Sequence, residues 1–161
     1  KRYGRFGWSK GALLNYCIGQ GEVLVTPIQV FNYINLLATM GNSYKPHFLK
    51  KERSNTNDTL ILSNHIWENI ITDMERVVYD DEGTGKSANP SYPNAKIFGK
   101  TGTAENPHGE DHAWFVGWMN FQSEQYSIVI LLENAGSGGT VAAPIAKEIF
   151  NNIINKNSNS S

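Results

Sequence analysis

The sequence predicts an α+β fold in which an antiparallel sheet packs against helices. Three strand-like stretches follow one another at 96–104, 112–121 and 126–133, and the loops between them are short enough for antiparallel neighbours. Two helical patterns precede these strands and one follows them. With 161 residues and 40% hydrophobic content, the chain has room for one domain with a real core.

The first helix is predicted to begin at Pro27. Thr26 can cap it, proline suits the first helical position, and Gln29 completes a capping box. Gly41 is a natural stop. Apolar residues follow at helical spacing, so we expect a buried helix; they are Val30, Phe31, Ile34, Leu37 and Ala38.

The segment before this helix, through Gly21, is rich in glycine and aromatic residues and predicts an ordered loop, with Cys17 as a small buried residue. After the helix, residues 44–50 fit an edge strand or an extended connector, because Pro46 cannot donate to a ladder. The charged and asparagine-rich residues 51–58 predict a surface loop.

A second helix is predicted after Ser63, which can cap it. Its apolar residues form one broad face; they are Ile66, Trp67, Ile70, Ile71, Met74, Val77 and Val78. Glycine, serine and proline return between Asp80 and Asn94 and predict a loop. This loop contains Gly85-Lys86-Ser87, but the earlier glycine and the preceding strand of a phosphate-binding loop are missing.

The strand-rich part alternates regularly. Trp114 and Trp118 point to one face of their strand and are most simply core residues. A glycine loop at 136–139 leads to a last helix, in which Ile145, Ile149 and Ile153 lie beside Ala146, Phe150 and Ile154. Residues 156–161 are mostly asparagine and serine and predict a disordered tail, which leaves 1–155 as the folded part.

Composition excludes several classes. A net charge of -1 and a pI near 6.5 give no basic excess for binding nucleic acid. The single Cys17 cannot form an internal disulfide. No apolar run approaches the roughly 20 residues that span a bilayer, and residues 1–4 lack the apolar core of a signal peptide.

The run from Lys100 to Ala104 is the candidate site. A lysine and two hydroxyls, from Thr101 and Thr103, can hold a carboxylate by charge and hydrogen bonds. Gly102 has no side chain, so a substrate backbone can lie flat against the strand there. The pattern therefore predicts a site for the C-terminal end of a peptide.

The flanking segments occur in a distinctive order: Asn15 to Glu22, Val25 to Gln29, Lys100 to Glu105, Asp111 to Trp118 and Leu132 to Gly136. Together they resemble the C-terminal part of class B penicillin-binding proteins, of the type 2 group that acts in rod elongation. The resemblance runs from about Trp8 to Ile154. It implies the C-terminal portion of the penicillin-binding protein and serine β-lactamase-like transpeptidase fold, whose sheet is covered by the terminal helix on one side and by helices on the other.

The resemblance also implies an activity. A serine would attack the D-Ala-D-Ala bond of a peptidoglycan stem peptide and pass the acyl group to an amine, and β-lactam antibiotics would acylate the same serine. Lys100 would help set the proton network of that serine, and Thr101 and Thr103 would bind the terminal carboxylate. The N–H of Thr103 would form half of an oxyanion hole, and Gly102 and Ala104 would lie along the substrate. No cofactor or metal is implied.

The nucleophile motif of this family, Ser-x-x-Lys, is absent, because no serine in this sequence has a lysine three positions later. Ser87-Ala88-Asn89 fits a Ser-x-Asn motif but follows the Gly-Gln-Gly segment instead of preceding it, so it is interpreted as loop. We therefore expect a missing N-terminal part to carry the nucleophile and a membrane anchor. The fragment alone should be inactive.

By resemblance, the parent would work at the periplasmic face of the bacterial inner membrane, with membrane proteins of the elongation complex as partners. Two alternatives remain: a D,D-carboxypeptidase or serine β-lactamase, which sends the acyl group to water, and a non-catalytic penicillin-sensing module of the same fold. The Gly-Gln-Gly and Asp-His-Ala-Trp segments favour the class B type.

Other polar clusters have simpler interpretations. His108, Glu110, Asp111 and His112 lie close together, but their spacing is no recognised metal-ligand pattern, and His112 is expected to make structural hydrogen bonds. Residues 19–21, Gly-Gln-Gly, are expected to shape the wall behind the cleft rather than to contact the substrate.

Overall fold

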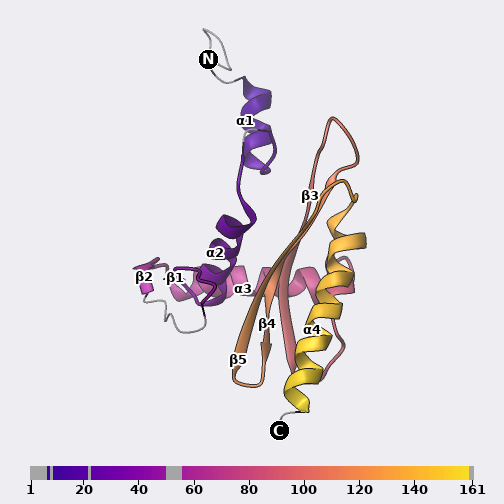
Figure 1. The fold of residues 1–161 in the computed structure, drawn as a ribbon. Coiled ribbons are helices and arrows are strands. Elements are labelled where there is room, and N and C mark those ends of the chain that lie inside the picture. The colour runs from indigo at the N-terminus through magenta and orange to yellow at the C-terminus, as the bar shows by residue number, and fades with distance from the viewer. Residues whose placement is uncertain (1–6, 8, 22, 50–55, 160–161) are drawn as a thin grey trace.

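The structure is a computed structural model that describes residues 7, 9–21, 23–49 and 56–159 (Figure 1). A three-stranded sheet in the order β3-β4-β5 stands at its centre. The strands are β3 (Ala95–Ala104), β4 (His112–Phe121) and β5 (Glu124–Leu132). Both pairings are antiparallel, as the sequence predicts, and β4 has the predicted bounds.

Helix α4 (Ala143–Ser158) packs along one face of this sheet (Figure 1). Its buried side chains include Phe150 and Ile154, which meet Ile97, Phe115 and Met119 of the strands. Of the two predicted apolar rows, the row with Phe150 enters the core, whereas Ile149 is 38% exposed. The helix continues to Ser158 and so includes Lys156 to Ser158 of the segment that the sequence assigns to a tail.

Helices α2 (Pro27–Ala38) and α3 (Asn64–Tyr79) cover part of the opposite face. There the rings of Phe98 and Trp118 stack with centroids 4.8 Å apart and an interplanar angle of 12°. Ile34 and Leu37 of α2 and Trp67 and Met74 of α3 complete this second core. The capping box of Thr26 and Gln29 is confirmed. Because α2 buries only one stripe, the prediction of a buried helix was too strong.

The predicted loop before α2 was wrong in part. Residues Lys10–Cys17 form helix α1, which Ser9 caps by accepting a hydrogen bond from the N–H of Ala12 at 3.1 Å. The run Ala12-Leu13-Leu14 has high helix propensity, which outweighs the glycine content around it. No residue of α1 is buried, and Cys17 is exposed where a buried position was predicted.

The predicted surface loop at 51–58 was also wrong where it can be compared. Strand β1 (Asn42–Tyr44) pairs antiparallel with β2 (Thr56–Thr59), and residues 51–55 lie outside the described part. The segment after Tyr44 is therefore the extended connector. Two short turns follow α3 and β5: a 3₁₀ turn at Lys86–Ala88, where a loop was predicted, and a π-helical turn at Gly138–Ala142.

An exposed ion pair lies at the end of α3. Arg76 on α3 donates to Asp80 Oδ2 at 2.7 Å. This hydrogen bond and the negative charge of Asp80 raise the pKa of Arg76.

Among the described helices, none is both long and apolar enough to cross a lipid bilayer.

Two neighbouring residues of α4 test the core. Phe150 is 0% exposed, so Phe150→Ala should lower the free energy of unfolding by about 3–5 kcal/mol through lost burial and a residual cavity. Ile149→Ala on the rim of the same helix should cost less than about 1 kcal/mol. Urea denaturation of both variants measures the difference, and equal losses would contradict this assignment of the core.

Candidate functional site

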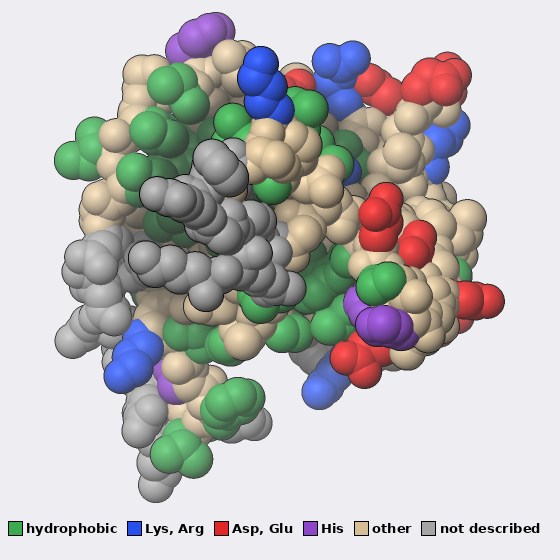
Figure 2. All heavy atoms as spheres, turned by 90° about the horizontal axis from the view of Figure 1, so that it is seen from above, with side chains coloured by type: hydrophobic (Ala, Val, Ile, Leu, Met, Phe, Trp, Pro, Cys, Tyr) green, Lys and Arg blue, Asp and Glu red, His purple; other side chains and the backbone are tan. Residues whose placement is uncertain are grey.

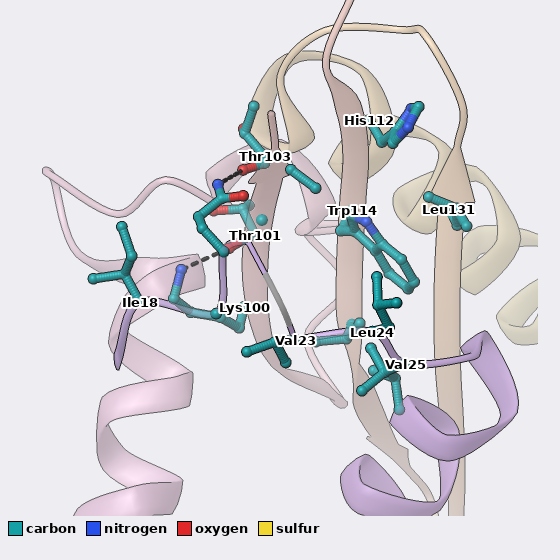
Figure 3. A pocket seen from close by; sticks show the side chains of 16 residues that line it. Ile18, Val23, Leu24, Val25, Lys100, Thr101, Thr103, His112, Trp114 and Leu131 are labelled. Carbon is teal, nitrogen blue, oxygen red and sulfur yellow. Dashed lines mark hydrogen bonds between the residues drawn. The ribbon is translucent and has the colours of Figure 1, made fainter. Parts of the chain in front are cut away.

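The candidate residues from Lys100 to Ala104 lie on the edge strand β3. Lys100 lies opposite Val116 in the register, and Thr101 lies opposite Phe115, so their side chains start on opposite faces of the sheet. The Lys100 side chain then turns back, and its Nζ donates to the carbonyl oxygen of Thr101 at 2.6 Å (Figure 3). The ammonium and the threonines therefore meet at the edge of the strand, which strict alternation of side chains did not predict.

The backbone of Thr103 points away from β4. Its carbonyl oxygen accepts a hydrogen bond from Gln20 Nε2 at 3.0 Å (Figure 3). In an antiparallel ladder a residue directs its N–H and its C=O toward the same side. The N–H of Thr103 therefore lies on the same open edge, beside the ammonium of Lys100.

The hydroxyls of Thr101 and Thr103 are oriented by neighbours. Thr101 Oγ1 lies 2.7 Å from Thr84 Oγ1, and Thr103 Oγ1 accepts from the N–H of Gly138 at 3.4 Å. A hydroxyl that accepts keeps its own hydrogen for donation, and a bonded pair of hydroxyls uses only one of its two hydrogens. Within the described part of the chain, these contacts leave two hydroxyl hydrogens that can bind an anion.

Gly138 sets how closely the π-helical turn approaches the strand. A Cβ at this position would overlap the carbonyl oxygens of Trp114 and Gly102. Only a residue without a side chain lets the turn come near enough for its N–H to reach Thr103. Sequence reasoning missed this contact, although the paired glycines at 138 and 139 were a visible signal of close backbone approach.

A pocket of about 730 Å³ opens beside this edge. Its β3 wall includes Lys100, Gly102 and Ala104, and its floor includes Trp114 from β4 (Figure 3). Trp118 is core as predicted, but Trp114 is only partly buried and lines this pocket. The remaining lining residues are mostly apolar; they are Ile18, Gly19, Gln20, Val23, Leu24, Val25, Val30, Thr101, Thr103, His112, Val116 and Leu131.

Residues 18–20 and 23–25 form the facing wall. Gly19 and Gln20 line the pocket, which agrees with the wall predicted for Gly-Gln-Gly, and Gln20 also binds the strand. Large apolar side chains of this region stay exposed, such as Ile18 at 74% and Leu24 at 82%. Seen from above, hydrophobic side chains are visible over this end of the molecule (Figure 2).

The acidic and histidine cluster holds loops together. His112 Nδ1 accepts from the N–H of Asn134 at 3.0 Å, which confirms its predicted structural role. The carbonyl oxygen of Asp111 accepts from the N–H groups of Ala135 and Gly136, each at 2.9 Å. These bonds fix the loop after β5, which leads directly to Gly138.

Ser87 also binds this loop, since its hydroxyl donates to the carbonyl oxygen of Gly139 at 2.7 Å. Together with the bond between Thr84 and Thr101, this contact joins the loop before β3 to the site. Neither contact was visible in the sequence, because both connect residues far apart in the chain without a local pattern.

Comparison with known proteins identifies relatives. Residues 2–151 match the family described as the penicillin binding protein transpeptidase domain. The chain is 30% identical to peptidoglycan D,D-transpeptidase MrdA of Haemophilus influenzae, over 97% of this chain and 28% of that protein. It is 25% identical to peptidoglycan D,D-transpeptidase MrdA of Escherichia coli K12, over 91% of this chain and 27% of that protein.

Solved structures give the same result. Pseudomonas aeruginosa PBP2, in complex with WCK 5153, is similar with a TM-score of 0.75 and 30% identity over 89% of this chain and 32% of that chain. Helicobacter pylori PBP2, in a complex with MreC, gives a TM-score of 0.72 and 26% identity over 89% and 28% of the two chains. The chain thus spans about a third or less of these relatives. By its sequence and its fold, it belongs to the penicillin-binding protein transpeptidase domain family.

Proposed function

We propose that these residues form the C-terminal part of a serine D,D-transpeptidase that cross-links peptidoglycan and is acylated by β-lactams. The observation that carries this proposal is the convergence at one open strand edge of the Lys100 ammonium, the hydroxyls of Thr101 and Thr103, and the N–H of Thr103. Together these groups can bind a peptide that ends in a carboxylate.

The donor peptide would lie along β3 as an added strand, because the open edge offers backbone groups for pairing. Its terminal carboxylate would accept from the two threonine hydroxyls, with Lys100 supplying a compensating charge. The scissile carbonyl oxygen would then face the N–H of Thr103, which donates to the negative charge that develops during attack.

The nucleophilic serine would come from a part of the protein outside these 161 residues. Its oxygen forms a bond to the carbonyl carbon, the bond to the leaving D-alanine breaks, and the serine proton passes through a network that includes Lys100 to the departing amine. The exposed apolar side chains at 13–25 support a further segment that covers this end.

The names of the relatives favour a transpeptidase over a carboxypeptidase, a β-lactamase or a sensing module. The likeness to a PBP2 solved with MreC supports the rod-elongation type, with membrane proteins of the elongation complex as partners. A transpeptidase of this type would act at the periplasmic face of the bacterial inner membrane.

The role of Lys100 can be tested in the full-length protein. Lys100→Ala should slow acylation by a fluorescent penicillin by about a hundredfold or more, the size expected for a lost proton-transfer group, with little change in melting temperature. Lys96→Ala serves as the control, because Lys96 lies on the same strand but pairs with Glu75 at 2.9 Å. An acylation rate for Lys100→Ala within a few-fold of that of the unsubstituted protein would contradict a proton-transfer role for Lys100.

A second test concerns the hydroxyls of Thr101 and Thr103. Replacing both with valine keeps their shape but removes the donors, so binding of β-lactams that carry a carboxylate should weaken by about 1–3 kcal/mol. Matched compounds with an esterified carboxylate should be little affected. Competition binding measures both sets, and equal weakening would make the hydroxyls structural.

The origin of the nucleophile gives a third test. Since no Ser-x-x-Lys occurs in these residues, the isolated chain should show no covalent label after incubation with fluorescent penicillin, while the full-length protein should label at one site. Denaturing gels and mass spectrometry provide the measurement. A stoichiometric adduct on any serine of the isolated chain would refute an external nucleophile.

A further inference from the structure

A second cavity, of about 480 Å³, lies next to the threonines of β3. It shares Thr101 and Thr103 with the larger pocket and extends from them to Lys86. Its walls are the loop before β3 and the π-helical turn after β5. Most of the lining residues carry a hydroxyl or have no side chain; they are Gly83, Thr84, Lys86, Ser87, Thr101, Thr103, Ser137, Gly139 and Thr140.

The two walls are joined by a hydrogen bond and by close backbone contact. Ser87 Oγ donates to the carbonyl oxygen of Gly139 at 2.7 Å and so joins the two walls, while within the turn Thr140 Oγ1 donates to the carbonyl oxygen of Ser137 at 3.2 Å. A Cβ at Gly139 would come within 2.6 Å of the carbonyl oxygen of Thr84, so the backbones themselves are in close contact. The cavity is therefore built into the fold and is preorganised for a ligand.

The chemistry of this cavity suits an anion. Its lining, which consists entirely of described residues, offers hydroxyl donors and the ammonium of Lys86, and it contains no acidic side chain. Lys86 Nζ lies 3.5 Å from Asp81 Oδ1 and donates to the carbonyl oxygen of Asp81 at 3.1 Å, and both side chains are exposed, at 51% and 103%. Such a surface pair contributes little, so the ammonium can turn to a carboxylate inside the cavity.

We propose that this cavity binds a carboxylate carried by the acceptor amine, an inference that rests on the proposed transpeptidase function. The acceptor must enter where the leaving amino acid departs, and that amino acid carries its carboxylate at Thr101 and Thr103. An acceptor whose carboxylate sits on the same carbon as its amine can use these hydroxyls and reach the ammonium of Lys86.

The acyl-transfer step is balanced without any further reactant. The acceptor nitrogen forms a bond to the carbonyl carbon of the acyl-enzyme ester, the bond from that carbon to the serine oxygen breaks, and the proton lost by the amine returns to the serine. Lys86 takes no part in the chemistry. It acts as a positioning residue that selects acceptors with a neighbouring carboxylate.

The test uses the full-length protein and a depsipeptide donor whose leaving group is a hydroxy acid. Transfer of the acyl group to D-alanine, which has the carboxylate, is compared with transfer to D-alaninamide, which lacks its charge. Lys86→Met should lower the ratio of D-alanine to D-alaninamide products about tenfold, as expected for a lost charge-assisted hydrogen bond. Lys45→Met, at an exposed lysine outside both cavities, should leave the ratio unchanged.

Penicillin acylation is measured in the same samples and reports separately on the proposed function. Because Lys86 takes no part in the chemistry, penicillin should still acylate Lys86→Met, at most about tenfold more slowly, since the penicillin carboxylate would bind at the same threonines. An unchanged product ratio, or equal losses with both acceptors, would overturn the acceptor site while acylation still supported a transpeptidase. A protein that penicillin does not acylate would overturn both proposals together.

Discussion

An open strand edge is the constraint on which the rest of this structure depends. Among the described strands, β3 pairs only with β4, and on its other side the carbonyl oxygen of Thr103 accepts a hydrogen bond from the Gln20 side chain. Unpaired edges are a liability in proteins, because they attract other chains. Here the same property offers a peptide substrate its backbone partners, provided that the edge is rigid and chemically selective.

Rigidity comes from two cores that hold the strand from both faces. Ile97 is packed toward α4, and Phe98 is stacked on Trp118 toward α2 and α3. At Gly117 the backbone of β4 lies so close to Phe98 that a Cβ would overlap its carbonyl oxygen. Selectivity comes from the edge itself, where an ammonium, two oriented hydroxyls and one N–H lie within a few residues.

Loops from elsewhere in the chain complete the edge. The turn at Gly138 orients the hydroxyl of Thr103, and Thr84 orients that of Thr101. Asp111 and His112 hold the loop that leads to this turn. The residues that orient the threonines therefore come from both sides of β3 in sequence, so a stable fold is a condition for a preorganised site.

Local patterns predicted the elements with strong periodicity or caps, such as β4 and the start of α2 at Thr26. They failed at α1, where glycine and aromatic content masked a short capped helix, and at β2, where polar residues pair with β1. The candidate site was predicted as a segment of one strand.

The paired glycines at 138 and 139 indicated a close backbone approach without its partner, and the contacts of Gln20 and Thr84 with that strand could not be predicted. Each joins residues distant in the chain, and no spacing in the sequence records such a contact. The same reason explains why the second cavity, which forms between two loops, had no sequence signal.

A crystal structure of the full-length protein acylated by a β-lactam would test the central claim most directly. We expect the β-lactam carboxylate to lie within hydrogen-bond distance of the hydroxyls of Thr101 and Thr103, with the acyl oxygen at the N–H of Thr103. An acyl group bound away from the edge of β3, or a carboxylate that contacts neither threonine, would contradict it.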